Sequence, residues 1–170
     1  MSTKDQRYEL LVQQVSALIE GETNAVSVMA NVAALLHAEM RPWWTGFYTV
    51  EGDSLLLGPF QGPVACYRIK RGHGVCGTAW AERRTIVVPD VDRFPGHIAC
   101  SDRSRSEIVV PIAADDGNIV AVLDIDSTEL NTFDDTDARY LARIAALLAP
   151  ILLPHQDTNK APIYNRPKTF

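Results

Sequence analysis

Hydrophobic residues recur at helical spacing over the first forty positions of the chain. Between residues 4 and 20 they lie three or four positions apart, which predicts an amphipathic helix that ends at Gly21. A second helix is predicted from Asn24 to Met40, because the same spacing continues and Pro42 follows. The side chains expected to face inward are Tyr8, Leu11, Val12, Val15, Leu18, Ile19, Val28, Val32, Leu35 and Leu36.

The middle of the chain is rich in aromatic and β-branched residues, which predicts strands. The predicted strands are 44–50, 55–60, 65–69, 85–88, 107–113 and 119–127. The turns at 51–54 and 115–118 predict that the first two and the last two strands form hairpins. A loop and a short helix are expected over 72–84, and an irregular segment over 89–106.

The end of the chain predicts one more helix and then a tail. Thr132 or Asp134 caps this helix, whose inner stripe is Tyr140, Leu141, Ile144, Leu147 and Leu148. Two helices, about six strands and a closing helix predict an α+β fold on a mostly antiparallel sheet flanked by helices. We expect one domain over 1–153, and an extended, proline-containing tail over 154–170.

Composition narrows the class of protein. Hydrophobic residues make up 46% and charged residues 22% of the 170 residues, as in ordinary globular proteins. The net charge of −5 argues against a nucleic-acid partner, and the longest apolar run is too short for a membrane span. The polar N-terminus does not have the pattern of a signal peptide, so we expect a cytoplasmic protein. Its three cysteines then leave thiol chemistry, metal binding or packing as their roles.

Two carboxylates lie two positions apart on the strand predicted at 119–127. Strand alternation places Asp124 and Asp126 on one face, with Val120 and Val122, and places Ile119, Ala121, Leu123 and Ile125 on the core face. Close carboxylates do not ionise independently, so this pair can bind a cation or act as an acid. The alternative is a strand end that meets solvent. Glu107 opens the neighbouring predicted strand and can join the pair.

The three cysteines have different surroundings. Cys66 lies in or beside a short strand and Cys76 near a short helix, where buried packing thiols are common. Cys100 lies in the polar stretch FPGHIACSDRSRS, which is unlike a packing site. His97 either lowers the pKa of Cys100 or bonds the loop backbone. The cysteine spacings match no common zinc motif, so no metal is expected.

The paired tryptophans Trp43 and Trp44 begin the first predicted strand. Alternation places them on opposite faces, so one packs in the core while the other can face a pocket.

Several segments in order resemble the free methionine-R-sulfoxide reductases, small stand-alone GAF-domain proteins. They are WWTGFY (43–48), LGPFQG (57–62), AC (65–66), GVCGTA (74–79), VPDV (88–91), FPGHIAC (94–100), SEIVVP (106–111) and VLDIDS (122–127).

The resemblance implies a GAF fold and reduction of the R epimer of free methionine sulfoxide. It implies a Cys100 nucleophile that becomes a sulfenic acid, a Cys66 resolving partner in a disulfide, and a third, exchangeable cysteine at Cys76. It also implies a homodimer that thioredoxin recycles, with no cofactor. The substrate-binding residues that it implies are Trp44, Ile98, Ala99, Glu107, Asp124 and Asp126.

Two other classes of function remain as alternatives. A non-catalytic, ligand-sensing GAF module is one, and the stretch Asn131 to Asp134 resembles part of a cyclic-nucleotide signature without its lysine. Three acids in a pocket would repel a phosphate, which disfavours that ligand. A zinc-dependent hydrolase is the other, and it would require near one equivalent of metal.

Overall fold

The computed structural model describes residues 3–98 and 102–153. The expected tail at 154–170 therefore lies outside the described residues, as do Ala99 and Cys100. The helices are α1 (Lys4–Leu18), α2 (Ala25–Met40), α3 (Gly74–Glu82) and α4 (Asp135–Leu152), with a 3₁₀ turn, η1, at Val91–Arg93. The strands are β1 (Trp44–Glu51), β2 (Ser54–Gln61), β3 (Arg68–Lys70), β4 (Ile86–Val88), β5 (Ser106–Ala113) and β6 (Ile119–Ser127).

The six strands form one sheet in the order β3-β2-β1-β6-β5-β4, and each described pairing is antiparallel. Both predicted hairpins, β1–β2 and β5–β6, are present. The long-range pairing of β1 with β6 joins these hairpins at the centre of the sheet. The predicted α+β class with a six-stranded antiparallel sheet is confirmed.

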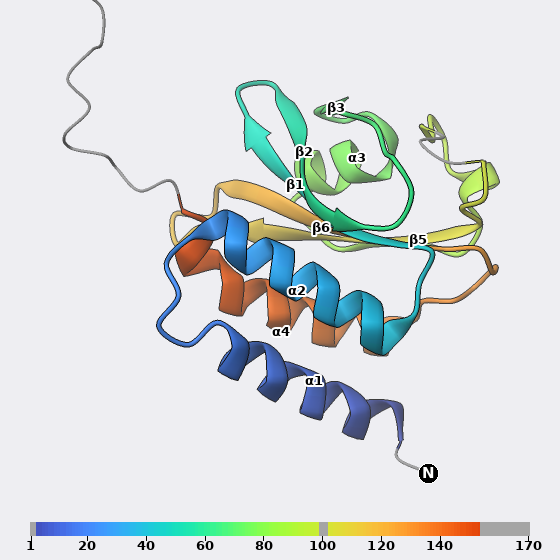
Figure 1. The fold of residues 1–170 in the computed structure, drawn as a ribbon. Coiled ribbons are helices and arrows are strands. Elements are labelled where there is room, and N and C mark those ends of the chain that lie inside the picture. Colours follow the sequence, from blue (N-terminus) through green and yellow to red (C-terminus); the bar gives the residue numbers. More distant parts are fainter. Residues whose placement is uncertain (1–2, 99–101, 154–170) are drawn as a thin grey trace, which may run out of the picture.

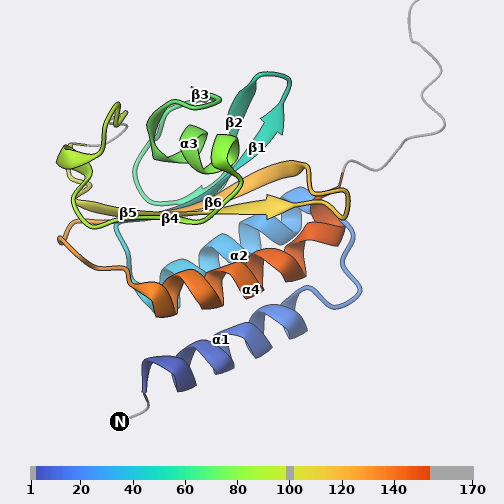
Figure 2. The same cartoon turned by 180° about the vertical axis from the view of Figure 1, so that it is seen from behind.

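Helices cover the two faces of the sheet unequally. On one face α2 and α4 lie against the strands, and α1 packs on the outside of these two helices (Figure 1). On the other face lies α3, close to β3 and the loop that leads to it (Figure 2). Each face has its own apolar cluster, one under α2 and α4 and a second under α3.

The ends of the long helices follow the capping rules that the sequence obeys. Thr3 and Asp134 each form a capping box, and the Asn24 side chain accepts a hydrogen bond from the Ser27 N–H. Asp134, one of the two predicted caps, is therefore the N-cap of α4. The first helix ends at Leu18, and this side chain is 38% exposed rather than inward-facing as predicted.

Buried polar contacts attach α1 to α4. Lys4 Nζ lies 2.5 Å from Asp137 Oδ2, and the Tyr8 hydroxyl donates to Asp137 Oδ1 at 2.5 Å. The Tyr8 and Tyr140 rings stack with centroids 5.1 Å apart. We call this set of residues the α1–α4 latch. No helix in the described part of the chain is long and apolar enough to cross a membrane.

The third strand begins later than its sequence predicts. The sequence predicts a strand over 65–69, whereas β3 is Arg68–Lys70. The preceding loop is held over β1 instead, because the Trp44 indole Nε1 donates to the Pro63 carbonyl at 3.1 Å. A tertiary contact of this kind outweighs local strand preference.

A β-bulge at the start of β6 reverses the predicted faces of Ile119 and Val120. Ala113 pairs with Ile119 but Ile112 pairs with Ala121, so one extra residue is inserted in β6. Ile119 consequently belongs to the cluster under α3, and Val120 packs against the cluster under α2 and α4. From Ala121 onward the predicted faces are correct.

Candidate active site

A cavity lies on the α3 face of the sheet, between β1, β5 and β6. Its floor comes from these strands, and its walls come from α3 and from the loops before β3 and β5. The residues that line it are Trp44, Tyr48, Val64, Ala65, Ile69, Gly74, Val75, Cys76, His97, Ile98, Ser104, Glu107, Asp124 and Asp126.

Strand register brings three carboxylates into this cavity. Glu107 on β5 pairs directly with Asp126 on β6, and Asp124 lies two residues earlier on the same face. Glu107 and Asp124 are each only 6% exposed. The prediction that these three carboxylates lie together is confirmed, and the alternative of a strand end that meets solvent at Asp124 is wrong.

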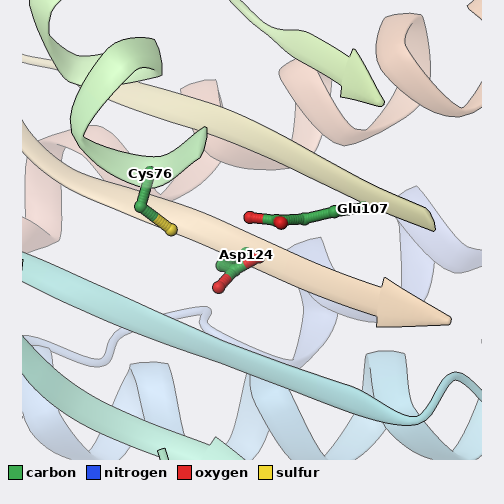
Figure 3. Close-up of side chains that lie close together, drawn as sticks. All are labelled: Cys76, Glu107 and Asp124. Atoms are coloured by element: carbon green, nitrogen blue, oxygen red, sulfur yellow. The ribbon is translucent and has the colours of Figure 1, made fainter. Parts of the chain in front are cut away.

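Cys76 lies beside the carboxylates, on the helix that covers the cavity. It lies in the first turn of α3, which the left-handed Gly74 (φ +59°) begins. A Cβ at Gly74 would lie 3.2 Å from Ile98 Cγ1, so glycine allows Ile98 to pack there. Figure 3 shows the Cys76 thiol directed toward Glu107 and Asp124.

The three side chains in Figure 3 also form a candidate metal-ligand set. One ligand atom from each of Cys76, Glu107 and Asp124 lies within 4.8 Å of the others. A thiolate and two carboxylates suit a divalent ion such as zinc. Elemental analysis therefore remains a necessary test beside the thiol chemistry.

Burial dominates the electrostatics of the cluster. It raises the pKa of Glu107 well above its ordinary value, and the charges of Asp124 and Asp126 raise it further. Burial likewise raises the pKa of Asp124 well above its ordinary value, and the charge of Asp126 adds to this, against hydrogen bonds with Cys76 and Glu107. Burial also raises the pKa of Asp126, to about 6, against a hydrogen bond from Ser104. The cluster therefore retains a proton near neutral pH, and it can act as an acid.

One buried oxygen of the cluster has no hydrogen-bond partner in the part of the chain that the structure describes. Asp124 Oδ1 is fully buried and has no hydrogen-bond partner among the described residues. A buried acceptor without a donor costs about 1–3 kcal/mol, so a ligand that donates a hydrogen bond there is favoured.

The Cys76 thiol is a poor nucleophile in this setting. Burial raises its pKa well above the ordinary value, and the charges of Asp124 and Glu107 raise it further. Cys76 is 3% exposed and is a free thiol. Thiolate is the reactive form of cysteine, so nucleophilic chemistry at Cys76 is disfavoured.

Trp44 forms one wall of the cavity. It is 4% exposed, and its ring stacks on Phe60 with centroids 5.3 Å apart. Gly46 lies beneath it, since a Cβ there would come within 2.4 Å of the indole. The prediction that one tryptophan faces a pocket is confirmed for Trp44. The prediction that the other packs in the core on the opposite face is wrong, because Trp43 precedes β1, is half-buried against the same apolar cluster and lies under Arg103, whose Cζ is 4.2 Å from the ring centroid.

The loops around the cavity carry the remaining predicted residues. Ile98 and His97 line it, and Cys66, in the loop before β3, is disulfide-bonded. His97 Nε2 is 3.8 Å from Glu107 Oε2, and burial lowers the pKa of His97 against the attraction of Asp92. The imidazole is therefore neutral near pH 7. The predicted roles of Cys100 and Ala99 fall on residues outside the described ranges.

Sequence reasoning did not single out two polar residues of the site. Tyr48 lies four positions after Trp44 on β1, so strand alternation places both on one face. That signal was available in the sequence. Ser104, 8% exposed and bonded to Asp126, comes from an irregular loop that carries no periodic signal.

The sheet, its flanking helices and the enclosed cavity on one face define the GAF-domain class. The family model described as "GAF domain" matches residues 25–152. The chain is also 51% identical over 147 residues to GAF domain-containing protein A of Dictyostelium discoideum, covering 86% of this chain and 92% of that protein.

Two further relatives define the family more narrowly. The chain is 45% identical to the free methionine-R-sulfoxide reductase of Escherichia coli, covering 88% of this chain and 90% of that protein. It is 48% identical, with a TM-score of 0.86, to the structure of the Neisseria meningitidis reductase of the same name in complex with its substrate, covering 89% and 92%. The chain belongs to the family of free methionine-R-sulfoxide reductases.

Proposed function

We propose that this protein reduces free methionine (R)-sulfoxide to methionine, with the cavity on the α3 face as its active site. Family membership supports the reaction. The observation that carries the assignment to this cavity is the buried carboxylate cluster, in which one Asp124 oxygen has no hydrogen-bond partner among residues 3–98 and 102–153.

The carboxylates select the substrate through its ammonium group. An ammonium offers three hydrogen-bond donors and a positive charge, which suit Asp124 Oδ1 and the neighbouring acids. A methionine residue within a protein has no such group, because its nitrogen is in a peptide bond. The cluster therefore favours the free amino acid. Trp44 provides an apolar wall for the methyl and methylene groups, and Ile98 adds to it.

The same cluster supplies a proton. Sulfoxide reduction needs a proton on the departing oxygen, and the raised pKa values of Glu107 and Asp124 keep a carboxylic acid available. A bound ammonium stabilises the ionised members of the cluster, so one acid donates while another binds the substrate.

Cys100 is the proposed nucleophile. Its thiolate attacks the sulfoxide sulfur, the oxygen is transferred, and methionine leaves a sulfenic acid on Cys100. The thiol of Cys66 then displaces water from the sulfenic acid to form a disulfide. The two thiols are oxidised by two electrons and the sulfoxide is reduced by two.

In this proposal Cys66 is the resolving cysteine, and Cys76 is the alternative. The disulfide-bonded state of Cys66 supports this choice. The free, buried Cys76 with its raised pKa is less suited to rapid exchange. Thioredoxin is the proposed reductant of the disulfide, and a homodimer is the proposed assembly, which sedimentation equilibrium tests directly.

The deciding experiment measures turnover of the separated R and S epimers of free methionine sulfoxide, with dithiothreitol as the reductant. Wild type is expected to reduce only the R epimer, and Cys100→Ser is expected to lose this activity. An N-acetylated R substrate, which has no ammonium, is expected to react far more slowly.

Three results would contradict the proposal. Full activity of Cys100→Ser would move the nucleophile to another cysteine. Equal rates with the N-acetylated substrate would remove the ammonium argument. An inactive wild type that contains near one equivalent of zinc would favour the metal-ligand set of Cys76, Glu107 and Asp124.

A further inference from the structure

The large hydrophobic side chains that flank Cys66 are unusually exposed. Val64 is 87% and Tyr67 is 82% exposed, whereas the next most exposed large hydrophobic residue described, Val26, is 62% exposed. Cys66 lies between the first two in the chain and is half-buried and disulfide-bonded. Exposed aromatic residues are enriched where proteins bind other proteins.

The same segment is basic in an otherwise acidic chain. Residues 61–71 contain three basic residues and no acidic one, whereas the whole chain has a net charge of −5. Arg68 and Lys70 are exposed on β3, an edge strand of the sheet. Neither takes part in an ion pair within the described part of the chain. Their charges are therefore available to a partner.

Backbone contacts hold this segment in place. The Pro63 carbonyl accepts from Trp44 Nε1 at 3.1 Å, and the Tyr67 carbonyl accepts from the Leu57 N–H at 3.0 Å. The exposed side chains consequently stand on a loop that is attached to the sheet on both sides of Cys66.

We propose that Val64, Tyr67, Arg68 and Lys70, here called the reductant surface, dock an acidic protein dithiol that reduces the Cys66 disulfide by attack on Cys66 Sγ. The inference rests on the proposed function, and it adds where the reductant binds and which sulfur it attacks. Apolar side chains supply contact area and the two cations supply orientation and a faster encounter.

The exchange balances in two steps. A thiolate of the partner attacks Cys66 Sγ, the Cys66 disulfide breaks, and its other sulfur leaves as a thiolate. The second thiol of the partner then attacks the mixed disulfide and releases Cys66. The partner loses two electrons and forms its own disulfide, and its two protons neutralise the released thiolates.

Charge favours a different protein over a second copy of this chain. Two copies that pair through the β3 edge would bring the Arg68 and Lys70 of one beside those of the other. Like charges placed opposite each other across paired strands are destabilising. An acidic partner meets no such cost.

Turnover with thioredoxin and turnover with dithiothreitol together distinguish a defect in reductant docking from a defect in catalysis. Tyr67→Ser and the double variant Arg68→Glu/Lys70→Glu change side chains that do not line the cavity. Each is expected to lower the rate supported by thioredoxin, its reductase and NADPH by about tenfold, which corresponds to about 1.4 kcal/mol. The rate with dithiothreitol is expected to stay within about twofold of wild type.

Matched controls lie on the opposite side of the molecule. Val26→Ser removes an exposed apolar side chain of α2, and Arg7→Glu reverses an exposed charge on α1. Both are expected to leave the two rates unchanged. If all variants retain the wild-type thioredoxin rate, the reductant surface is wrong. If the wild type fails even with dithiothreitol, the proposed function itself is wrong.

A trapping experiment identifies the attacked sulfur. Thioredoxin without its second active-site cysteine is incubated with the oxidised protein, and the mixed disulfide is mapped by mass spectrometry. Cys66 is the expected attachment site, and attachment at another cysteine overturns the proposal. Loss of a dimer in Tyr67→Ser, measured by sedimentation equilibrium, would instead assign this surface to a second copy of the chain.

Discussion

Asp126 shows how a single residue helps to keep a proton in the site at the expense of folding stability. It faces Glu107 across paired strands and shares its strand face with Asp124. Burial and proximity make full ionisation of the three unfavourable. The same repulsion that destabilises the folded protein retains the proton that the proposed reaction needs.

The first prediction concerns the pH dependence of stability. The pKa of Asp126 is about 6 in the folded protein and 3.8 ordinarily, so between these values the folded state binds more protons than the unfolded state. The free energy of unfolding therefore falls as pH rises through this window, by up to roughly 3 kcal/mol. Asp126→Asn cannot ionise and is expected to lose less stability between pH 4.5 and 7.5, measured by urea unfolding.

The exposed Asp115→Asn provides the control for this experiment, and its stability profile is expected to follow that of the wild type. Identical losses of stability in Asp126→Asn and wild type would show that ionisation of Asp126 does not destabilise the folded protein.

The second prediction separates the two described cysteines. Cys66→Ser is expected to reduce thioredoxin-supported turnover by at least about tenfold, because a sulfenic acid without its resolving thiol recycles slowly. Cys76→Ser is expected to retain most of this turnover, since Cys76 is a buried, free thiol with a raised pKa. The measurement is NADPH consumption in the coupled assay, and reversed effects of the two variants would exchange their roles.

At the scale of elements, α3 closes the cavity because it packs unusually tightly on the end of β3. A Cβ at Gly77 would lie 2.3 Å from the Lys70 carbonyl oxygen, a backbone atom that cannot rotate away. The Gly77 N–H and carbonyl also bond residues of the turn that precedes the helix. Glycine at this position therefore fixes the height of Cys76 above the carboxylates.

The third prediction follows from this contact. Gly77→Ala is expected to destabilise the protein by about 1–3 kcal/mol in urea unfolding, because α3 must move away from β3. The displacement is also expected to speed the reaction of Cys76 with a thiol reagent. Glu82→Ala, at the exposed end of the same helix, is the control and should stay within about 0.5 kcal/mol. An equal effect of both variants would argue against the close approach.

At the scale of the whole molecule, α1 lies outside the residues that the GAF family model matches, yet it is bound firmly to the domain. The α1–α4 latch places the carboxylate of Asp137, whose side chain is 5% exposed, between Lys4 and Tyr8. A buried carboxylate is tolerated when its partners supply charge and hydrogen bonds. The latch thus joins the first helix to the last across the outer helical layer.

The fourth prediction tests the latch. Lys4→Met keeps an apolar stem but leaves the Asp137 carboxylate without its cation, so stability is expected to fall by about 1–3 kcal/mol. Arg84→Met is the control, because its pair with Glu82 is exposed and should contribute at most about 1 kcal/mol. Urea unfolding at neutral pH measures both, and equal small losses would mean that the latch adds little.

The sequence by itself determined most of the local structure. Capping residues such as Asn24 and Asp134 and the spacing of apolar residues located the helices, because these signals act within one or two turns. Turn residues located both hairpins. Strand alternation placed Asp124 and Asp126 on one face, since this follows from the period of any strand.

Only the tertiary structure determined which residues contact that face of β6. Asp124 is buried because α3 and two loops cover it, and Glu107 reaches it because β5 pairs with β6 in one register. The bulge at Ile119, the late start of β3 and the placement of Ser104 likewise depend on contacts between distant segments. Alternation and capping are properties of neighbouring residues, whereas burial, register and the resulting pKa shifts exist only when the strands, α3 and the loops are assembled.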